Sequence, residues 1–232
     1  MVSGLAVPRR VNWPQTWRII RSIWPPIDLF EDIADPRDWE ALVSVEAKTN
    51  PRIRNEVGDL GKVPPARRVG GPGASLVMAP FVHCSTARPG RFTDGGYGIY
   101  YAGDREDVAL AETIHHHAKF MAATDEARGW TSDFRAMIGS IDRELHDVNA
   151  VPDVLHPTDY APSQVEGAGL RAAGSDGLLW NSVRMPGGQC IGVFWPDVVT
   201  IPVQGSHFCY HWNGERVDFV KRHDTGEVLE VA

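Results

Sequence analysis

Apolar side chains recur along this chain with helical spacing in some segments and strand-like character in others. Near the N-terminus they lie three or four residues apart, at Trp13, Trp17, Ile20 and Trp24. This spacing predicts a helix with one apolar face. Prolines interrupt the pattern up to about residue 65, so residues 1–65 are predicted to form a Trp-rich helical extension. Its apolar face could pack on the main body or contact a partner.

Beyond residue 65 the pattern changes. Residues 75–83 predict a buried strand, and residues 97–102 predict a second strand after a glycine-rich turn. Asp104 is a good N-cap for a following helix, with Asp107 as a second acid in its first turn. The apolar stripe of that helix comprises Val108, Ala111, Ile114, Ala118 and Met121.

Strands dominate the C-terminal half. Ser163 and Glu166 form a capping box for a helix that Gly174 ends. The predicted strands are 134–148 (with a turn), 178–184, 190–195, 207–212 and 217–220, the last two flanking the hairpin signal Asn213–Gly214. Strands and helices do not alternate regularly, so the predicted class is α+β with a mixed or antiparallel sheet. The main domain is assigned to residues 66–232.

Composition narrows the function classes. The net charge of −7 and pI of about 5.7 argue against a broad nucleic-acid surface. The three cysteines are far apart without a CxxC pair, which fits neither a disulfide framework nor a zinc motif. We expect no signal peptide and no membrane span, because no apolar run of the required length is found in the sequence. We therefore expect a cytoplasmic protein with reduced thiols and no membrane partner; homo-oligomerisation stays open.

Common catalytic fingerprints are missing: the chain has no Walker loop, HExxH, GxSxG or GxGxxG. The run His115, His116 and His117 suggests a metal site at first sight. Consecutive helical residues point 100° apart, however, so the three cannot all bind one ion. We expect a solvated helix flank there and predict no metal site.

The segment RFTDGGYGIYYAGDREDVALAE, from Arg91 to Glu112, holds the strongest chemical signal. It combines an arginine, a glycine-rich turn, two adjacent tyrosines and a glutamate. Glu112 borders the apolar face of the predicted helix, where a carboxylate is costly unless a charged or hydrogen-bonding group meets it. These residue types suit a dinucleotide-cleaving site, although a plain strand–turn–helix would also account for them.

RFTDGGYGIYYA leading to ALAETI, and GLLWNSVR before an apolar hairpin, resemble the RES domain family, named for an Arg, a Glu and a Ser. The resemblance covers roughly residues 66–215. It implies a fold like that of diphtheria-type ADP-ribosyltransferases and the destruction of NAD⁺. It also implies that the protein is the toxin of a bacterial toxin–antitoxin pair, with a protein antitoxin as its partner.

The resemblance assigns the family Glu to Glu112 and the family Ser to Ser182. Tyr101, eleven residues before Glu112, matches a tyrosine expected beside the nicotinamide ribose. Each also has a structural alternative: Glu112 in an ion pair, Ser182 as an ordinary strand-end serine and Tyr101 as a core aromatic.

The family Arg often lies in the first strand, where this chain's predicted first strand offers His83. Arg91, followed by Phe92, occupies the later Gly-Arg-aromatic place, and Arg68 is a second candidate. We assign the family Arg to Arg91, whose alternative role is a solvated loop charge.

In the implied chemistry, Glu112 stabilises the oxocarbenium-like sugar as neutral nicotinamide leaves. Arginine binds phosphate bidentately, so Arg91 and Arg68 are expected to hold the pyrophosphate. Tyr97 or Tyr101 would stack on nicotinamide. Ser182 would hydrogen-bond to ribose or amide. Trp180, two residues earlier on the same strand face, would wall the site.

NAD⁺ is then a substrate, no cofactor is needed, and water or phosphate is the acceptor. ADP-ribose transfer to a protein and a degenerate NAD-binding or interaction module stay open as alternatives. An acidic residue or Gln one turn before Glu112 would indicate a protein acceptor. Val108, Ala109 and Leu110 stand there instead, which favours small acceptors.

Overall fold

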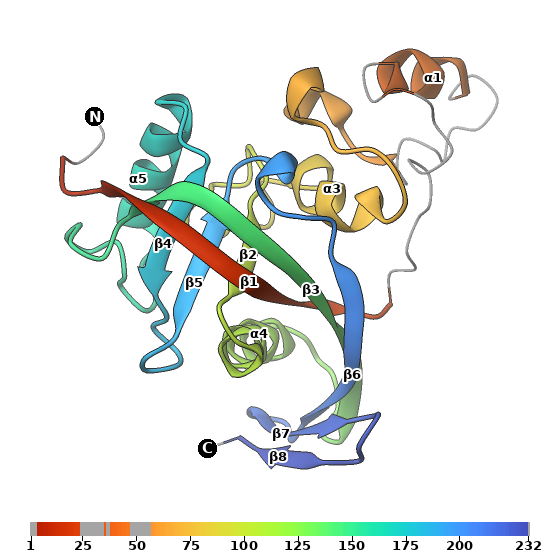
Figure 1. The fold of residues 1–232 in the computed structure, drawn as a ribbon. Coiled ribbons are helices and arrows are strands. Elements are labelled where there is room, and N and C mark those ends of the chain that lie inside the picture. The colour runs from red at the N-terminus through yellow and green to blue at the C-terminus, as the bar shows by residue number, and fades with distance from the viewer. Residues whose placement is uncertain (1–3, 24–34, 36–37, 47–56, 232) are drawn as a thin grey trace.

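An eight-stranded mixed sheet organises the chain (Figure 1). The computed structural model describes residues 4–23, 35, 38–46 and 57–231. The strands are β1 (Val7–Arg21), β2 (Tyr100–Gly103), β3 (Trp130–Asp147), β4 (Gly177–Asn181), β5 (Gln189–Val193), β6 (Val203–Trp212), β7 (Val217–Arg222) and β8 (Val228–Glu230). The helices are α1 (Trp39–Glu46), α3 (Ala74–Val82), α4 (Glu106–Met121) and α5 (Ala161–Ala172), with short 3₁₀ turns η1 (Leu60–Lys62), η2 (Pro65–Arg67) and η3 (Pro196–Val198). The predicted α+β class with a mixed sheet is confirmed.

The strand order is β1-β2-β5-β4-β3-β6-β7-β8, and β1 also pairs with β3. That extra pairing closes a ring of the first five strands. In the described part of the chain, β3 and β4 run parallel and the other pairs antiparallel. From β3, the strands β6, β7 and β8 continue as an arm that ends at the C-terminus (Figure 1).

The N-terminal segment differs most from expectation. Residues 7–21 form a long strand, so the predicted helix carrying Trp13 and Trp17 is wrong; Trp24 lies outside the described residues. β1 pairs with β3 from Val7 opposite Asp147 to Arg21 opposite Phe134, with an irregularity between Trp13 and Thr16. Long-range backbone pairing with β3 satisfies every second amide and outweighs the local helical spacing. Of the segment 1–65, the described residues 39–46 are helical.

The predicted strand over residues 75–83 is also wrong, because this segment forms α3. Its buried residues Val77, Met78, Phe81 and Val82 pack into a core shared with β2 and β5. An apolar run without clear periodicity does not distinguish a buried helix from a buried strand. Consequently His83 caps a helix instead of lying in the first strand.

Both predicted helix caps are wrong. The N-cap of α4 is Arg105, whereas the Asp104 carboxylate accepts a hydrogen bond from the Gln189 amide and joins β5. Ser163 lies inside α5, where its hydroxyl donates to the carbonyl of Arg91 at 2.6 Å. Both side chains therefore form hydrogen bonds to distant segments instead of capping a helix.

Other local predictions are confirmed. β6 and β7 form the hairpin expected around Asn213–Gly214, with Gly214 at φ +99°. Gly174 follows α5 at φ +86°. No helix in the described ranges is both long and apolar enough to cross a membrane.

Candidate functional site

Glu112 and Ser182 meet where α4 passes the turn after β4. The Ser182 hydroxyl donates a hydrogen bond to Glu112 Oε1 at 2.7 Å. It also accepts hydrogen bonds from the backbone amides of Arg184 and Met185, each at 3.1 Å. With one donated and two accepted bonds, the hydroxyl has its full complement of partners. Ser182 is thereby fixed in orientation, and it presents its proton to the carboxylate.

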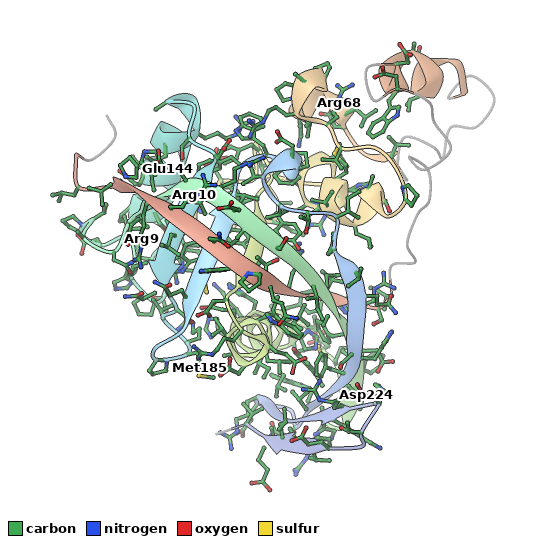
Figure 2. All side chains as sticks on the ribbon, viewed as in Figure 1. Arg9, Arg10, Arg68, Glu144, Met185 and Asp224 are labelled. Carbon is green, nitrogen blue, oxygen red and sulfur yellow. The ribbon has the colours of Figure 1, made fainter. Side chains whose placement is uncertain are left out.

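The turn that carries Ser182 is itself anchored. The Ser182 amide donates to the Gly188 carbonyl at 2.9 Å, which closes the loop between β4 and β5. In Figure 2, Met185 marks this loop next to α4. The loop thus brings a residue after β4 against the helix that holds Glu112.

Cys190 lies behind the carboxylate. Its Sγ is 3.8 Å from Glu112 Oε1, and the side chain is buried in β5. Burial raises the pKa of the Cys190 thiol, and the Glu112 carboxylate raises it further. Cys190 is therefore a neutral thiol that closes the inner side of the site.

Arg91 interacts electrostatically with Glu112. Burial lowers the pKa of Arg91, while Tyr160 and Glu112 act in the opposite direction. Its guanidinium donates to the carbonyls of His156 at 2.8 Å and Val154 at 3.3 Å, and it stacks on the Tyr160 ring at 4.5 Å. Arg91 therefore contributes positive charge to the site and also holds the 148–160 loop, rather than being solvated.

Arg184 is a site residue that the sequence reasoning missed. It follows Ser182 by two positions, and its Nη2 donates to the Pro157 carbonyl at 2.5 Å. Its charge lowers the pKa of Arg91 and of His115, for which burial is the larger cause. The charge of Arg91 therefore interacts both with the Glu112 carboxylate and with the guanidinium of Arg184. The motif NSVR could have indicated Arg184 as a site residue, because the turn that carries Ser182 also carries Arg184.

The three histidines of α4 have different environments. His117 is buried and stacks edge-on against Phe134 at 4.9 Å and Tyr210 at 6.0 Å, so the expected solvated flank is wrong for this residue. Burial, with Arg21, lowers the pKa of His117 to about 4. Its neutral ring is part of the core beneath α4.

Tyr101 and Trp180 share one face of the sheet with Cys190. Their rings lie edge to face with centres 6.1 Å apart, and Trp180 also contacts Phe92 at 4.8 Å. The Phe92 amide donates to the Tyr101 hydroxyl at 3.1 Å. Trp180 is buried, so it supports this face from within the core.

A pocket of about 210 Å³ opens beside the tyrosines. Tyr97 and Tyr101 line it together with Arg18, His83, Cys84 and Arg88. The Tyr97 hydroxyl donates to the Phe92 carbonyl at 2.6 Å. Gly95, in the predicted turn, has φ +93°, and a Cβ there would lie 2.1 Å from the Ser85 carbonyl oxygen. The volume suits a ring or a single phosphate rather than a whole dinucleotide.

Arg18 is the second residue that sequence reasoning missed. It lies on β1, the true first strand, and its Nη1 donates to the Tyr101 carbonyl at 3.1 Å. Its guanidinium lies 4.8 Å from the centre of the Tyr100 ring, and burial lowers its pKa. Arg18 therefore adds a positive charge beside the tyrosines of the pocket. The wrong helix prediction concealed it.

Arg68 is not brought to Glu112. Its guanidinium donates to the carbonyls of Val63 and Leu60, each at 3.0 Å, and the side chain is buried. Figure 2 shows Arg68 near η2, well apart from Met185 beside α4. Through these hydrogen bonds Arg68 stabilises the segment before α3.

The sequence model of the RES domain matches residues 65–213. The chain belongs to the RES domain family. An uncharacterized protein of Sinorhizobium fredii, y4oC, is 28% identical over 210 residues, which cover 90% of this chain and 87% of that protein. A chain in the crystal structure of the M. tuberculosis MbcT–MbcA toxin–antitoxin complex aligns at a TM-score of 0.44 and 11% identity. The alignment covers 86% of this chain and 85% of that one. The RES match includes Glu112, Ser182, Arg91 and Arg184 and ends before β7.

Proposed function

We propose that this RES domain protein cleaves the bond between nicotinamide and ribose in NAD⁺. The observation that carries the proposal is the Glu112 carboxylate, oriented by the Ser182 hydroxyl at 2.7 Å and interacting electrostatically with Arg91. Bond cleavage builds positive charge on the ribose, and a fixed carboxylate stabilises that charge. Nicotinamide leaves as a neutral molecule, so a second carboxylate acting as a general acid is not needed.

The two arginines suit the rest of the substrate. A pyrophosphate carries two negative charges, and arginine forks bind its oxygens bidentately. Arg91 is held by carbonyls of the 148–160 loop, and Arg184 by the carbonyl of Pro157. Both are therefore positioned before substrate arrives, which reduces the entropy lost on binding. Bound pyrophosphate would also relieve the repulsion between them.

The tyrosine pocket is assigned to an end group of the substrate. Tyr97 and Tyr101 offer aromatic faces, and Arg18 gives the pocket a positive charge. Nicotinamide stacked on one of these tyrosines would be held at this end of the substrate. The Ser182 hydroxyl, which donates a hydrogen bond to Glu112 in the free protein, would donate it either to the carboxylate or to a ribose hydroxyl of the bound substrate.

The acceptor is assigned to water or phosphate. One turn before Glu112, the side chains of Val108, Ala109 and Leu110 are all buried. None of them can activate a hydroxyl or guanidinium of a target protein. This arrangement favours a small acceptor over ADP-ribose transfer to a protein.

The biological role is assigned by family membership. We propose that the protein acts as a toxin that depletes NAD⁺ and that a protein antitoxin blocks the site. Expression alone should arrest growth and lower cellular NAD⁺. Co-expression of the neighbouring gene product should restore both and yield a complex with the chain. Failure of both rescue and complex formation would remove the antitoxin assignment.

The deciding experiment measures NAD⁺ loss by the purified protein, with and without phosphate, and identifies products by mass spectrometry. Nicotinamide with ADP-ribose, or with its phosphorylated form, is expected. Glu112→Gln should reduce turnover by at least about a hundredfold, the usual cost of losing one electrostatic group. Glu126→Gln, an exposed glutamate outside the site, is the matched control and should retain full turnover.

Two outcomes contradict the proposal. An ADP-ribose adduct on a protein, seen by intact mass, indicates transferase activity instead. Tight NAD⁺ binding without turnover by folded protein indicates a binding module. Thermal melting of Glu112→Gln excludes unfolding as the cause of any loss.

A further inference from the structure

A group of side chains with no role in the proposed reaction lies on the arm formed by β3, β6 and β7. Asp133 comes from β3, Cys209 from β6, and His223 follows β7 directly. Their ligand atoms all lie within 4.8 Å of one another. Among the residues that the structure describes, this is the one group of three or more His, Cys, Asp or Glu with such a spacing.

The strand pairing places these side chains together. Asp133 and Cys209 are directly opposite in the β3–β6 ladder, and opposite side chains on one face lie about 5 Å apart at Cβ. The His223 amide donates to the His207 carbonyl at 2.9 Å, which continues the β6–β7 pairing. His223 Nε2 is 3.3 Å from Asp133 Oδ1.

The group lies on the opposite side of the sheet from α4. The neighbours Phe134, Phe208 and Tyr210 point inward and pack with α4 residues. Successive strand residues alternate between faces, so Asp133 and Cys209 face outward. Asp133 and His223 are exposed and Cys209 is half-buried. An ion could reach the group without entering the Glu112 site.

We propose that Asp133, Cys209 and His223 bind a divalent metal ion of the zinc class. Thiolate, imidazole and carboxylate are together the donors that Zn²⁺ prefers, and bond lengths of about 2.0–2.3 Å put tetrahedral ligands roughly 3.3–3.8 Å apart. The His223–Asp133 separation of 3.3 Å already meets that requirement. The exposed side chains leave room for the remaining adjustment and for a water molecule at the fourth position.

The local charges are compatible with an ion. Burial raises the pKa of the Cys209 thiol and Asp133 raises it further, so the thiol is protonated when no metal is bound. A divalent ion would displace that proton and balance the thiolate and carboxylate. Lys221 lies opposite Cys209 on β7 but is exposed, so its ammonium group can extend into solvent.

The expected consequence is structural. One ion would tie together β3, β6 and the end of β7, so the arm would be stabilised in the folded state only. The role is separate from NAD⁺ cleavage, because a packed core lies between this face of the sheet and α4, which carries Glu112. The three ligands are widely spaced in the sequence, at 133, 209 and 223, and β7 lies beyond the RES match.

Metal binding is tested by titrating the full chain with Zn²⁺ against a chromophoric chelator. One equivalent should bind, and Cys209→Ser and His223→Asn should each weaken the affinity at least tenfold. Co²⁺ should give a near-ultraviolet thiolate charge-transfer band that Cys209→Ser abolishes. Cys84→Ser, a cysteine in the tyrosine pocket, is the matched control and should keep the band.

Thermal melting gives a second measurement that does not depend on the spectra. Zn²⁺ should raise the Tm of the native chain but not of His223→Asn, whose exposed side chain can change without disturbing the core. Three results would each overturn the proposal. They are a native chain that binds Zn²⁺ no more tightly than Cys209→Ser, a Co²⁺ charge-transfer band that persists in Cys209→Ser, and equal Tm shifts in the native chain and His223→Asn.

Discussion

The Ser182 hydroxyl donates to the Glu112 carboxylate at 2.7 Å although the residues are 70 positions apart in the chain. Neither residue can be oriented as observed without the other's element, because Glu112 lies on α4 and Ser182 on the turn after β4. We expect the pair to act as a unit in substrate cleavage.

The pair can be tested by a double-mutant cycle. Ser182→Ala removes the bond to Glu112 and leaves the amides of Arg184 and Met185 without their acceptor. We expect at least a tenfold loss of kcat/KM and a destabilisation of about 1–3 kcal/mol. The losses in kcat/KM of Ser182→Ala and Glu112→Gln should not add in the double variant, since contacting residues couple. Additive losses would show that the two side chains act independently.

Arg184 should determine substrate affinity. Arg184→Gln removes the guanidinium group whose charge interacts with that of Arg91. Because a charged hydrogen bond contributes roughly 1.5–3 kcal/mol, we expect KM for NAD⁺ to rise at least tenfold with a smaller change in kcat. Arg128→Gln, at an exposed position before β3, is the control and should leave KM unchanged. A fall in kcat with constant KM would assign Arg184 to the chemical step.

Substitutions of Arg18 and Arg68 should have different effects on kcat/KM and on Tm. Arg18 contacts the Tyr101 carbonyl and lines the tyrosine pocket, whereas Arg68 bonds to the carbonyls of Leu60 and Val63. Arg18→Gln should therefore lower kcat/KM at least tenfold. Arg68→Met should lower Tm and leave kcat/KM of the folded protein within about twofold. Steady-state kinetics and melting curves on both variants decide, and the reverse pattern would assign substrate binding to Arg68 instead of Arg18.

Stability should depend on His117 below neutral pH. Its pKa is lowered to about 4 in the folded chain, mainly by burial, against about 6.5 when unfolded. The unfolded state therefore takes up the proton first as pH falls. The contribution of His117 to the free energy of unfolding is fully present above about pH 6.5 and is lost between about pH 6.5 and 4. The lost stability is at most about 3.5 kcal/mol, at roughly 1.4 kcal/mol per pKa unit.

The measurement is denaturant unfolding at several pH values. His117→Leu should reduce the pH dependence between pH 6.5 and 4.5, because the apolar side chain fits among Phe134 and Tyr210 without titrating. Some dependence should remain, because burial also lowers the pKa of His116 to about 4. His223→Asn, an exposed histidine, should keep the native slope in metal-free buffer. An unchanged slope in His117→Leu would assign the effect to other groups.

The sequence by itself determined the features that local chemistry specifies. The hairpin at Asn213–Gly214, the helix end at Gly174 and the helix carrying Glu112 follow from turn residues and short-range periodicity. The RES assignment also followed from motif order and is confirmed by the match over residues 65–213. These signals need no knowledge of which segments meet.

Only the tertiary structure decided the rest. Strand β1 forms because it pairs with β3 along almost its whole length, whereas the spacing of Trp13 and Trp17 predicted a helix. The same error hid Arg18, while Arg184 gained its place through a loop that folds against α4. Local propensities differ by fractions of a kcal/mol per residue, whereas long-range backbone pairing and core burial act over whole elements. Where the two disagree, as in β1, the contacts between distant segments determine the fold and the site.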